Sequence, residues 1–124
     1  IRSGRYVSDV ADYVGELLVA ARTRYATEEG PDAGLDASAS FIIGGQIAGQ
    51  EPELYMVYPE GNHIAASSSQ PYLQIGETKY GKPILDRILQ ADTEPETAMR
   101  CAIVSVDSTM RSNATVGPPI ECLF

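Results

Sequence analysis

Residues 74–89, QIGETKYGKPILDRIL, combine a glycine turn, polar side chains and the predicted start of a helix. The first turn of a helix carries backbone N–H groups without intrahelical partners, so an anion or a reacting group can be held there. Three occupants are open: a phosphate, a catalytic nucleophile, or only the next layer of the fold. Glu77 disfavours a phosphate, because its carboxylate would repel the anion.

A second polar stretch, residues 107–115 with the sequence DSTMRSNAT, surrounds the predicted end of another helix. It brings together four hydroxyls, one carboxylate, one guanidinium and one amide. Capping of the helix end and hydrogen bonding within the loop are sufficient explanations for any single one of these side chains. The density of polar groups nevertheless makes this segment a second candidate site.

Composition and charge exclude several classes of function. The 124 residues are 44% hydrophobic and 21% charged, as in ordinary folded domains. The formal net charge of −8 would repel a nucleic-acid backbone, so no nucleic-acid partner is expected. No apolar run approaches the roughly 20 residues that a membrane-spanning helix needs, so we expect no association with a membrane.

The sequence also predicts no metal and no cofactor. It contains neither a GxGxxG motif nor a P-loop, and His63 is its only histidine. Cys101 and Cys122 lack the spacing of a metal site. We expect a reduced, cytoplasmic setting in which both thiols are buried.

The order of the predicted elements favours an α+β fold with an antiparallel sheet. Apolar residues three and four positions apart predict an amphipathic helix over residues 7–25 with one buried face. That face is expected to contain Val7, Val10, Ala11, Val14, Leu17, Leu18 and Ala21. The remaining expected elements are strands at 38–48, 54–58, 63–67 and 72–75, helices at 81–89 and from an N-cap at Thr93 to about residue 113, and a last strand at 116–124.

Three stretches of the chain, in this order, resemble the proteasome β-subunit superfamily and, within it, the bacterial proteasome-type peptidases called Anbu. They are SFIIGGQIAGQEPELYMVYPEGN (40–62), QIGETKYGKPILDRI (74–88) and VDSTMRSNATVGPP (106–119). The resemblance implies a four-layer αββα sandwich, the fold of the N-terminal-nucleophile hydrolases. Residues 1–124 would be a single proteasome-like domain, incomplete at both ends, that forms the central-to-C-terminal part of this sandwich.

The resemblance also implies an activity. In this superfamily the first residue of the mature chain is a threonine, whose hydroxyl attacks a peptide carbonyl while the α-amino group of the same residue serves as general base. An α-amine has an ordinary pKa of about 7.7–8.0 and is therefore partly neutral at working pH. This chemistry needs no cofactor.

Three supporting site residues follow from the same resemblance: Glu77, Ser112 and Thr115. Glu77 stands where the family's Gly-Ser-Gly turn has its serine, and its carboxylate would raise the pKa of a neighbouring N-terminal ammonium group. Thr78 is the alternative, because its hydroxyl would take the place of the hydroxyl of that serine. Ser112 and Thr115 fall at the Asp and Ser positions of the family's Arg-Asp-x-x-Ser-Gly-Gly motif, and Asp107, one helical turn earlier, is a candidate to replace the missing aspartate.

The nucleophile itself is not among these residues. Ile1 has no nucleophilic side chain, and no early segment resembles the family's catalytic threonine, aspartate and lysine strands. We therefore expect residues 1–124 to be an internal portion of a longer protein and to show no peptidase turnover alone. The resemblance further implies a peptide or protein substrate and self-association into a ring-like or helical homo-oligomer.

Two other functions remain open from the sequence. One is a non-catalytic structural subunit of a proteasome-like assembly, which would keep the sandwich and lack the nucleophile. The other is an unrelated α+β ligand-binding module with a similar order of strands and helices.

Overall fold

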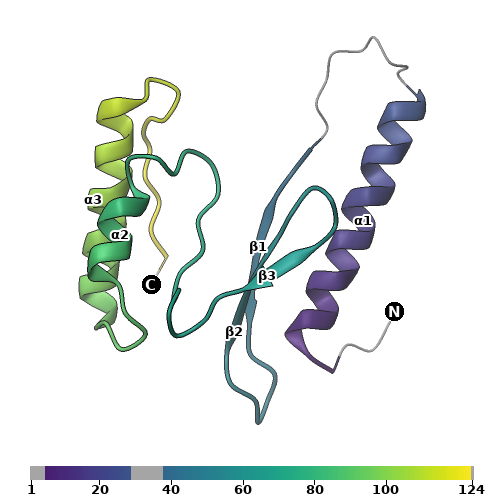
Figure 1. The fold of residues 1–124 in the computed structure, drawn as a ribbon, viewed down its shortest axis with the longest axis horizontal. Helices are drawn as coiled ribbons and strands as arrows, with labels where there is room; N and C mark the ends of the chain where they lie inside the picture. Colours follow the sequence, from purple (N-terminus) through teal and green to yellow (C-terminus); the bar gives the residue numbers. More distant parts are fainter. Residues whose placement is uncertain (1–4, 29–37, 124) are drawn as a thin grey trace. The chain divides into compact units, whose positions relative to one another are not determined.

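The computed structural model describes residues 5–28 and 38–123 (Figure 1). The chain forms two compact units, residues 1–66 and 67–124. Ile1, on which the expectation of an internal portion of a longer protein partly depends, lies outside the described residues. The single domain expected for residues 1–124 stays a prediction.

The first unit contains one helix and a three-stranded antiparallel sheet. Helix α1 is Val7–Glu28, and the strands are β1 (Phe41–Gly45), β2 (Glu53–Val57) and β3 (His63–Ala65), in the order β1-β2-β3. In the register Gly44 lies opposite Leu54, and Met56 lies opposite Ile64. The expected helix and the three expected strands are confirmed; β1 and β3 are shorter than expected, and β2 begins one residue earlier.

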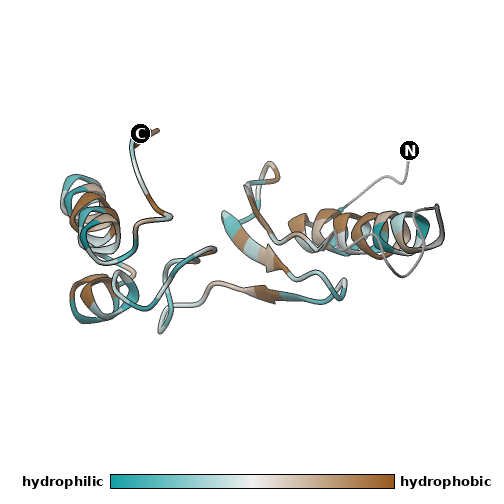
Figure 2. Ribbon diagram, turned by 90° about the horizontal axis from the view of Figure 1, so that it is seen from above, coloured by the Kyte–Doolittle hydropathy of each residue, from teal (hydrophilic) through white to brown (hydrophobic). Residues whose placement is uncertain are grey.

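The core of this unit lies between α1 and the sheet, which run alongside each other in Figure 1. Val7 and Ala11 of α1 and Tyr55 and Val57 of β2 are buried. Partly buried residues packed against these four are Val14, Leu18, Ile43 and Ile47. Apolar residues recur along the whole length of α1, seen as the brown segments in Figure 2, but only some of them contribute to this core.

The prediction that seven apolar residues of α1 share one buried face is wrong for three of them. Val10 is 45% exposed, Leu17 is 50% exposed, and Ala21 is also exposed. At 3.6 residues per turn, positions 7, 11, 14 and 18 fall close to one line along the helix. Val10, Leu17 and Ala21 lie to one side of that line, so a single sheet cannot cover both sets.

The second unit contains helices α2 (Lys82–Ile88) and α3 (Pro95–Ser112), which lie side by side in Figures 1 and 2. Leu85 of α2 is buried, as are Cys101, Ser105 and Thr109 of α3. Gly81, just before α2, allows the close approach: a Cβ at this position would collide with the Ser105 hydroxyl and lie 3.1 Å from the Ser105 carbonyl oxygen. The two helices expected in this part of the chain are confirmed.

The expected N-cap of α3 is wrong. The N-cap residue is Glu94, and it makes no capping side-chain hydrogen bond. The Thr93 hydroxyl instead accepts a hydrogen bond from the Gln90 N–H at 2.8 Å. The Thr93 N–H also donates to the Gln90 carbonyl at 3.0 Å, so both polar groups of Thr93 stabilise the turn before α3 and not the helix start.

The expected strands at 72–75 and 116–124 are not present among the described residues, where both segments run without a paired neighbour. A β-strand is defined by its hydrogen-bonded ladder, and a β-rich composition does not supply the partner. The expectation for the thiols was half right. Cys101 is buried, whereas Cys122 is exposed, and both are free.

Candidate functional site

The turn before α2 is built around Gly76 and Glu77. Gly76 has a φ of +89°, a backbone conformation that residues with a Cβ rarely adopt. The turn brings Glu77 Oε1 within 2.8 Å of the Lys79 backbone N–H, which donates to it. Lys82 N–H then donates to the Thr78 carbonyl at 3.0 Å, which leads the chain into α2. The carboxylate is therefore held by the backbone of its own turn.

The end of α3 holds an amide in a similarly fixed position. Asn113 is the C-cap residue, and its backbone N–H donates to the Thr109 carbonyl at 2.8 Å. Its side-chain oxygen Oδ1 accepts from the Thr115 N–H at 2.9 Å and from the Thr115 hydroxyl at 2.7 Å. An Asn side chain bonded to the backbone two residues later forms an Asx turn, which fixes its orientation.

The turn that carries Glu77 and the Asx turn of Asn113 are joined by a hydrogen bond. Asn113 Nδ2 donates a hydrogen bond to Glu77 Oε2 at 3.1 Å, across 36 positions of sequence. The result is a continuous chain of hydrogen bonds that runs from the Lys79 amide through Glu77 and Asn113 to Thr115. We call these three residues, Glu77, Asn113 and Thr115, the acid–amide–hydroxyl network.

The network favours the ionised form of the Glu77 carboxylate. The Lys79 backbone N–H and, after it, the Asn113 amide hold the pKa of Glu77 below its usual range, because both donate to the charged form. A carboxylate offers about four acceptor positions, so two donors leave it capacity for another. At neutral pH this group can accept a hydrogen bond from a cation but cannot donate one.

The structure places the three predicted site residues differently. Glu77 and Thr115 are brought into one network, whereas Ser112 is the exposed last residue of α3. Within the described part of the chain, no hydrogen bond connects the Ser112 hydroxyl to that network. In the described residues Asp107 accepts a hydrogen bond from Arg111 Nε at 2.7 Å along the same helix, and no hydrogen bond joins it to the network. The role of each residue in catalysis stays a prediction.

Asn113 is the residue that sequence reasoning missed. It was part of the polar stretch 107–115, but it was not assigned a role of its own. The available signal was its position directly after the last turn of a helix, where Asn commonly ends the helix and forms local turns. Nothing in the sequence indicated that its side chain would reach Glu77.

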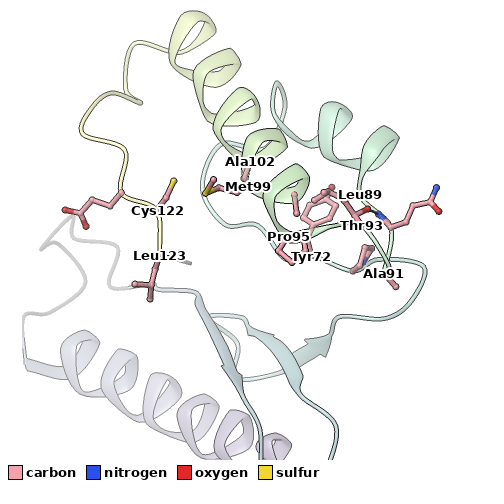
Figure 3. A pocket seen from close by; sticks show the side chains of 13 residues that line it. Tyr72, Leu89, Ala91, Thr93, Pro95, Met99, Ala102, Cys122 and Leu123 are labelled. Atoms are coloured by element: carbon pink, nitrogen blue, oxygen red, sulfur yellow. Dashed lines mark hydrogen bonds between the residues drawn. The ribbon is translucent and has the colours of Figure 1, made fainter.

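A cavity of about 600 Å³ also lies within residues 67–124, between the start of α3, the loop before it and the last described residues. Figure 3 shows Tyr72, Met99, Ala102, Cys122 and Leu123 around it. Its lining is mostly apolar, and none of the network residues belongs to it. The cavity and the acid–amide–hydroxyl network are therefore separate features.

Among residues 5–28 and 38–123, no group of three or more His, Cys, Asp or Glu side chains is arranged to hold a metal ion. His63 lies half-buried on β3, with Nδ1 3.4 Å from Asp12 Oδ1 and its ring edge-on to Tyr55. No helix in the described part of the chain combines the length and apolarity that crossing a membrane requires.

No family model matches the sequence, and no curated protein matches it either. Known structures do match. Anbu (ancestral beta-subunit) from Yersinia bercovieri is 40% identical, with a TM-score of 0.85 over 96% of this chain and 47% of that one. The helical assembly of the Anbu complex from Pseudomonas aeruginosa is 50% identical, with a TM-score of 0.79 over 95% of this chain and 51% of that one.

A third match is the Anbu (Gly-1) mutant from Hyphomicrobium sp. strain MC1, which is 40% identical with a TM-score of 0.81, over 94% of this chain and 47% of that one. The chain thus spans about half the length of each of these proteins. Identities of 40% and 50% over nearly all of its residues exclude an unrelated α+β module that shares only the order of elements. The chain belongs to the Anbu family, the ancestral β-subunit relatives of the proteasome β subunits, as the three sequence stretches predicted.

Proposed function

We propose that these residues form the central-to-C-terminal part of a proteasome-like threonine-type peptidase whose nucleophile lies outside residues 1–124. In the complete protein they would belong to one domain with the four-layer αββα sandwich of the N-terminal-nucleophile hydrolases. Two facts support this proposal: the Anbu relatives are about twice as long as this chain, and the acid–amide–hydroxyl network is suited to hold a cationic group.

In the proposed reaction the hydroxyl oxygen of an N-terminal threonine bonds to the carbonyl carbon of a peptide. The α-amine of that threonine takes the hydroxyl proton and later gives it to the departing amine of the substrate, and water then releases the acyl group. Glu77 would accept a hydrogen bond from the ammonium form of the α-amine. Asn113 would fix Glu77, and Thr115 would fix Asn113, through the bonds described above.

The effect of Glu77 on the α-amine has a definite sign. A carboxylate favours the charged form of a neighbouring amine, so it raises the pKa of that amine. A higher pKa makes the amine a stronger base and leaves a smaller neutral fraction at a given pH. The chemistry would therefore run best somewhat above neutral pH.

The observation that supports this function most strongly is the hydrogen bond between Asn113 and Glu77, which unites two predicted site elements far apart in the sequence. The test is hydrolysis of fluorogenic peptides by the full-length protein and its Glu77→Ala variant. Loss of an oriented group beside the nucleophile is expected to lower turnover by at least about tenfold. The matched control is Glu96→Ala, which removes an exposed carboxylate of α3 that pairs with Arg100 at 2.6 Å on the same helix. Equal activities of the two variants would contradict the role of Glu77.

The second candidate is a non-catalytic structural subunit of a proteasome-like assembly. One observation favours it: Ser112, at the position of the family's aspartate, is exposed and stands apart from the network in the described residues. Mass spectrometry of the N-terminal peptide of the mature full-length protein separates the two candidates. A threonine at the first position supports the peptidase, and any residue without a nucleophilic side chain supports the structural subunit.

We also propose that the complete protein self-associates into a ring-like or helical homo-oligomer, acts on peptides or proteins, and works in the cytoplasm. The helical assembly of the related complex from Pseudomonas aeruginosa supports the first of these statements. Native mass spectrometry of the full-length protein is the test. A discrete or open-ended series of multimers agrees with the proposal, and a monomer at micromolar concentration contradicts it.

A further inference from the structure

Three polar side chains near the start of α2 form a cluster apart from the acid–amide–hydroxyl network. The Tyr72 hydroxyl donates to Asp86 Oδ1 at 2.6 Å. Lys82 Nζ donates to both Asp86 oxygens, at 2.8 and 2.9 Å, and to the Tyr72 hydroxyl at 3.3 Å. The Lys82 ammonium group also lies 5.5 Å from the centre of the Tyr72 ring. Each of these residues contacts the other two.

This cluster closes a loop. Lys82 and Asp86 are four positions apart on α2, whereas Tyr72 lies ten positions before Lys82 on the extended segment that leads to the Gly76 turn. Glu77 is halfway between the two ends of this loop. The Tyr72 hydroxyl thus links the extended segment before the Gly76 turn to α2 by hydrogen bonds.

The far side of the loop is fastened as well. Gly81 lies close to α3, because a Cβ at this position would collide with the Ser105 hydroxyl and lie 3.2 Å from the Thr109 hydroxyl oxygen. The Thr109 carbonyl also accepts the backbone N–H of Asn113 at 2.8 Å. The same turn of α3 therefore supports both Asn113 and the start of α2. With one end held by Tyr72 and the other by Gly81, the turn that carries Glu77 has little freedom to move away from Asn113.

The protonation states of the cluster agree with a mechanical role. Burial, followed by the bond to Asp86, raises the pKa of the Tyr72 hydroxyl, and the bond to Asp86 raises the pKa of Lys82. Both groups therefore carry their protons at neutral pH and are poorly suited to remove a proton from a substrate. What they offer is a fixed geometry.

We propose that Tyr72, through its hydrogen bond to Asp86 on α2, is a positioning residue that holds the Glu77 carboxylate against Asn113. For its effect on turnover, this inference rests on the proposed peptidase function. Its effect on the loop does not. The substrate and the nucleophile would not touch Tyr72, which acts only through the loop.

The test uses Tyr72→Phe in the full-length protein. This variant keeps the ring, which lines the cavity of Figure 3 and lies beneath Lys82, and removes only the hydroxyl. The matched control is Tyr80→Phe, a tyrosine of the same loop whose hydroxyl makes no hydrogen bond within the described residues. Hydrogen–deuterium exchange of the peptide covering residues 76–82 is measured first, because it contains the Lys79 and Lys82 amides that the turn protects.

We expect exchange of this peptide to become at least about threefold faster in Tyr72→Phe and to stay unchanged in Tyr80→Phe. In the same samples, kcat for peptide hydrolysis should fall by about three- to tenfold while KM stays within about twofold, since a misplaced supporting group affects the reaction more than substrate binding. Asp86→Asn retains an acceptor for the Tyr72 hydroxyl and should give an intermediate effect in both measurements.

The outcomes separate the two claims. Unchanged exchange in Tyr72→Phe overturns the positioning role, whatever the activity. Faster exchange with unchanged kcat leaves the loop closure standing and overturns the claimed effect of Tyr72 on turnover, because the loop would then move without consequence for the reaction. If the wild-type protein hydrolyses no peptide and exchange is nevertheless faster in Tyr72→Phe, the loop closure stands and the proposed function fails.

Discussion

Gly81 provides the sharpest test of how α2 is placed on α3. Its backbone conformation, with φ −86° and ψ −40°, is one that alanine also adopts, so Gly81→Ala causes no backbone strain. The added Cβ would collide with the Ser105 hydroxyl and lie 3.2 Å from the Thr109 hydroxyl oxygen. Both of these residues are buried, at 2% and 4% exposure, so they have little room to move.

The expected size of the effect follows from two opposing contributions. Overpacking of a closely packed contact costs about 1–3 kcal/mol. Replacing a glycine in a compatible conformation stabilises by about 0.4–1 kcal/mol, because the unfolded chain loses freedom. We therefore expect Gly81→Ala to lower the free energy of unfolding by about 1–2 kcal/mol, which urea unfolding followed by circular dichroism resolves.

Two further variants make this prediction specific. Gly117→Ala is the control, because no atom lies within 4 Å of a Cβ at that position. Ser105→Ala removes the colliding oxygen, so the double variant Gly81→Ala/Ser105→Ala should recover about 1 kcal/mol relative to the sum of the single changes. A Gly81→Ala protein as stable as Gly117→Ala, or a double variant without recovery, would refute the close approach of α2 and α3.

Three other predictions concern the loop and the network. Gly76→Ala should destabilise the protein by about 1–2 kcal/mol in the same urea assay, because Gly76 has a φ of +89° and no neighbour within 4 Å that could compensate. The Lys82 ammonium group holds the pKa of Asp86 below its ordinary value, so this carboxylate stabilises the fold above its unfolded-state pKa and the stabilisation is lost as the pH falls. Urea midpoints measured from neutral pH downward should therefore fall less steeply in Asp86→Asn than in the wild type, and equal slopes would contradict this. Asn113→Ala should bring the pKa of Glu77 closer to its ordinary value, detectable by NMR titration of the side chain, and an unchanged pKa would mean that the Asn113 amide does not contribute.

The sequence predicted most elements that depend on local pattern. Apolar spacing predicted α1, and the strands expected at 54–58 and 63–67 correspond to β2 and β3, between which Gly61 has a φ of +90°. The predicted N-cap was wrong because a side chain there can hydrogen-bond to either of two local partners. Thr93 has the sequence context of an N-cap, but its hydroxyl serves the preceding turn. Prediction was also wrong for segments 72–75 and 116–124, because strand pairing depends on a neighbour that the segment's own composition does not specify.

In the candidate site, too, local motifs predicted some features and missed those that depend on distant contacts. Glu77 and Thr115 are predicted from a resemblance to family motifs, and the structure places Glu77 in the turn before α2 and Thr115 in the turn after α3. The bond that unites them depends on the direction of one side chain, that of Asn113, and on a contact across 36 positions. No periodicity or spacing encodes such a contact, since it is created by the packing of α2 on α3.

The central claim is that Glu77 supports the terminal amine of a threonine nucleophile, and the pH dependence of kcat/KM of the full-length protein tests it most directly. If the carboxylate raises the pKa of that amine, its removal in Glu77→Gln should shift the acid limb of the profile to lower pH by about 1 unit, because opposite charges in contact shift a pKa by about 1–3 units. Glu96→Gln should leave the limb in place. An acid limb that stays fixed in Glu77→Gln, or moves to higher pH, would contradict the account.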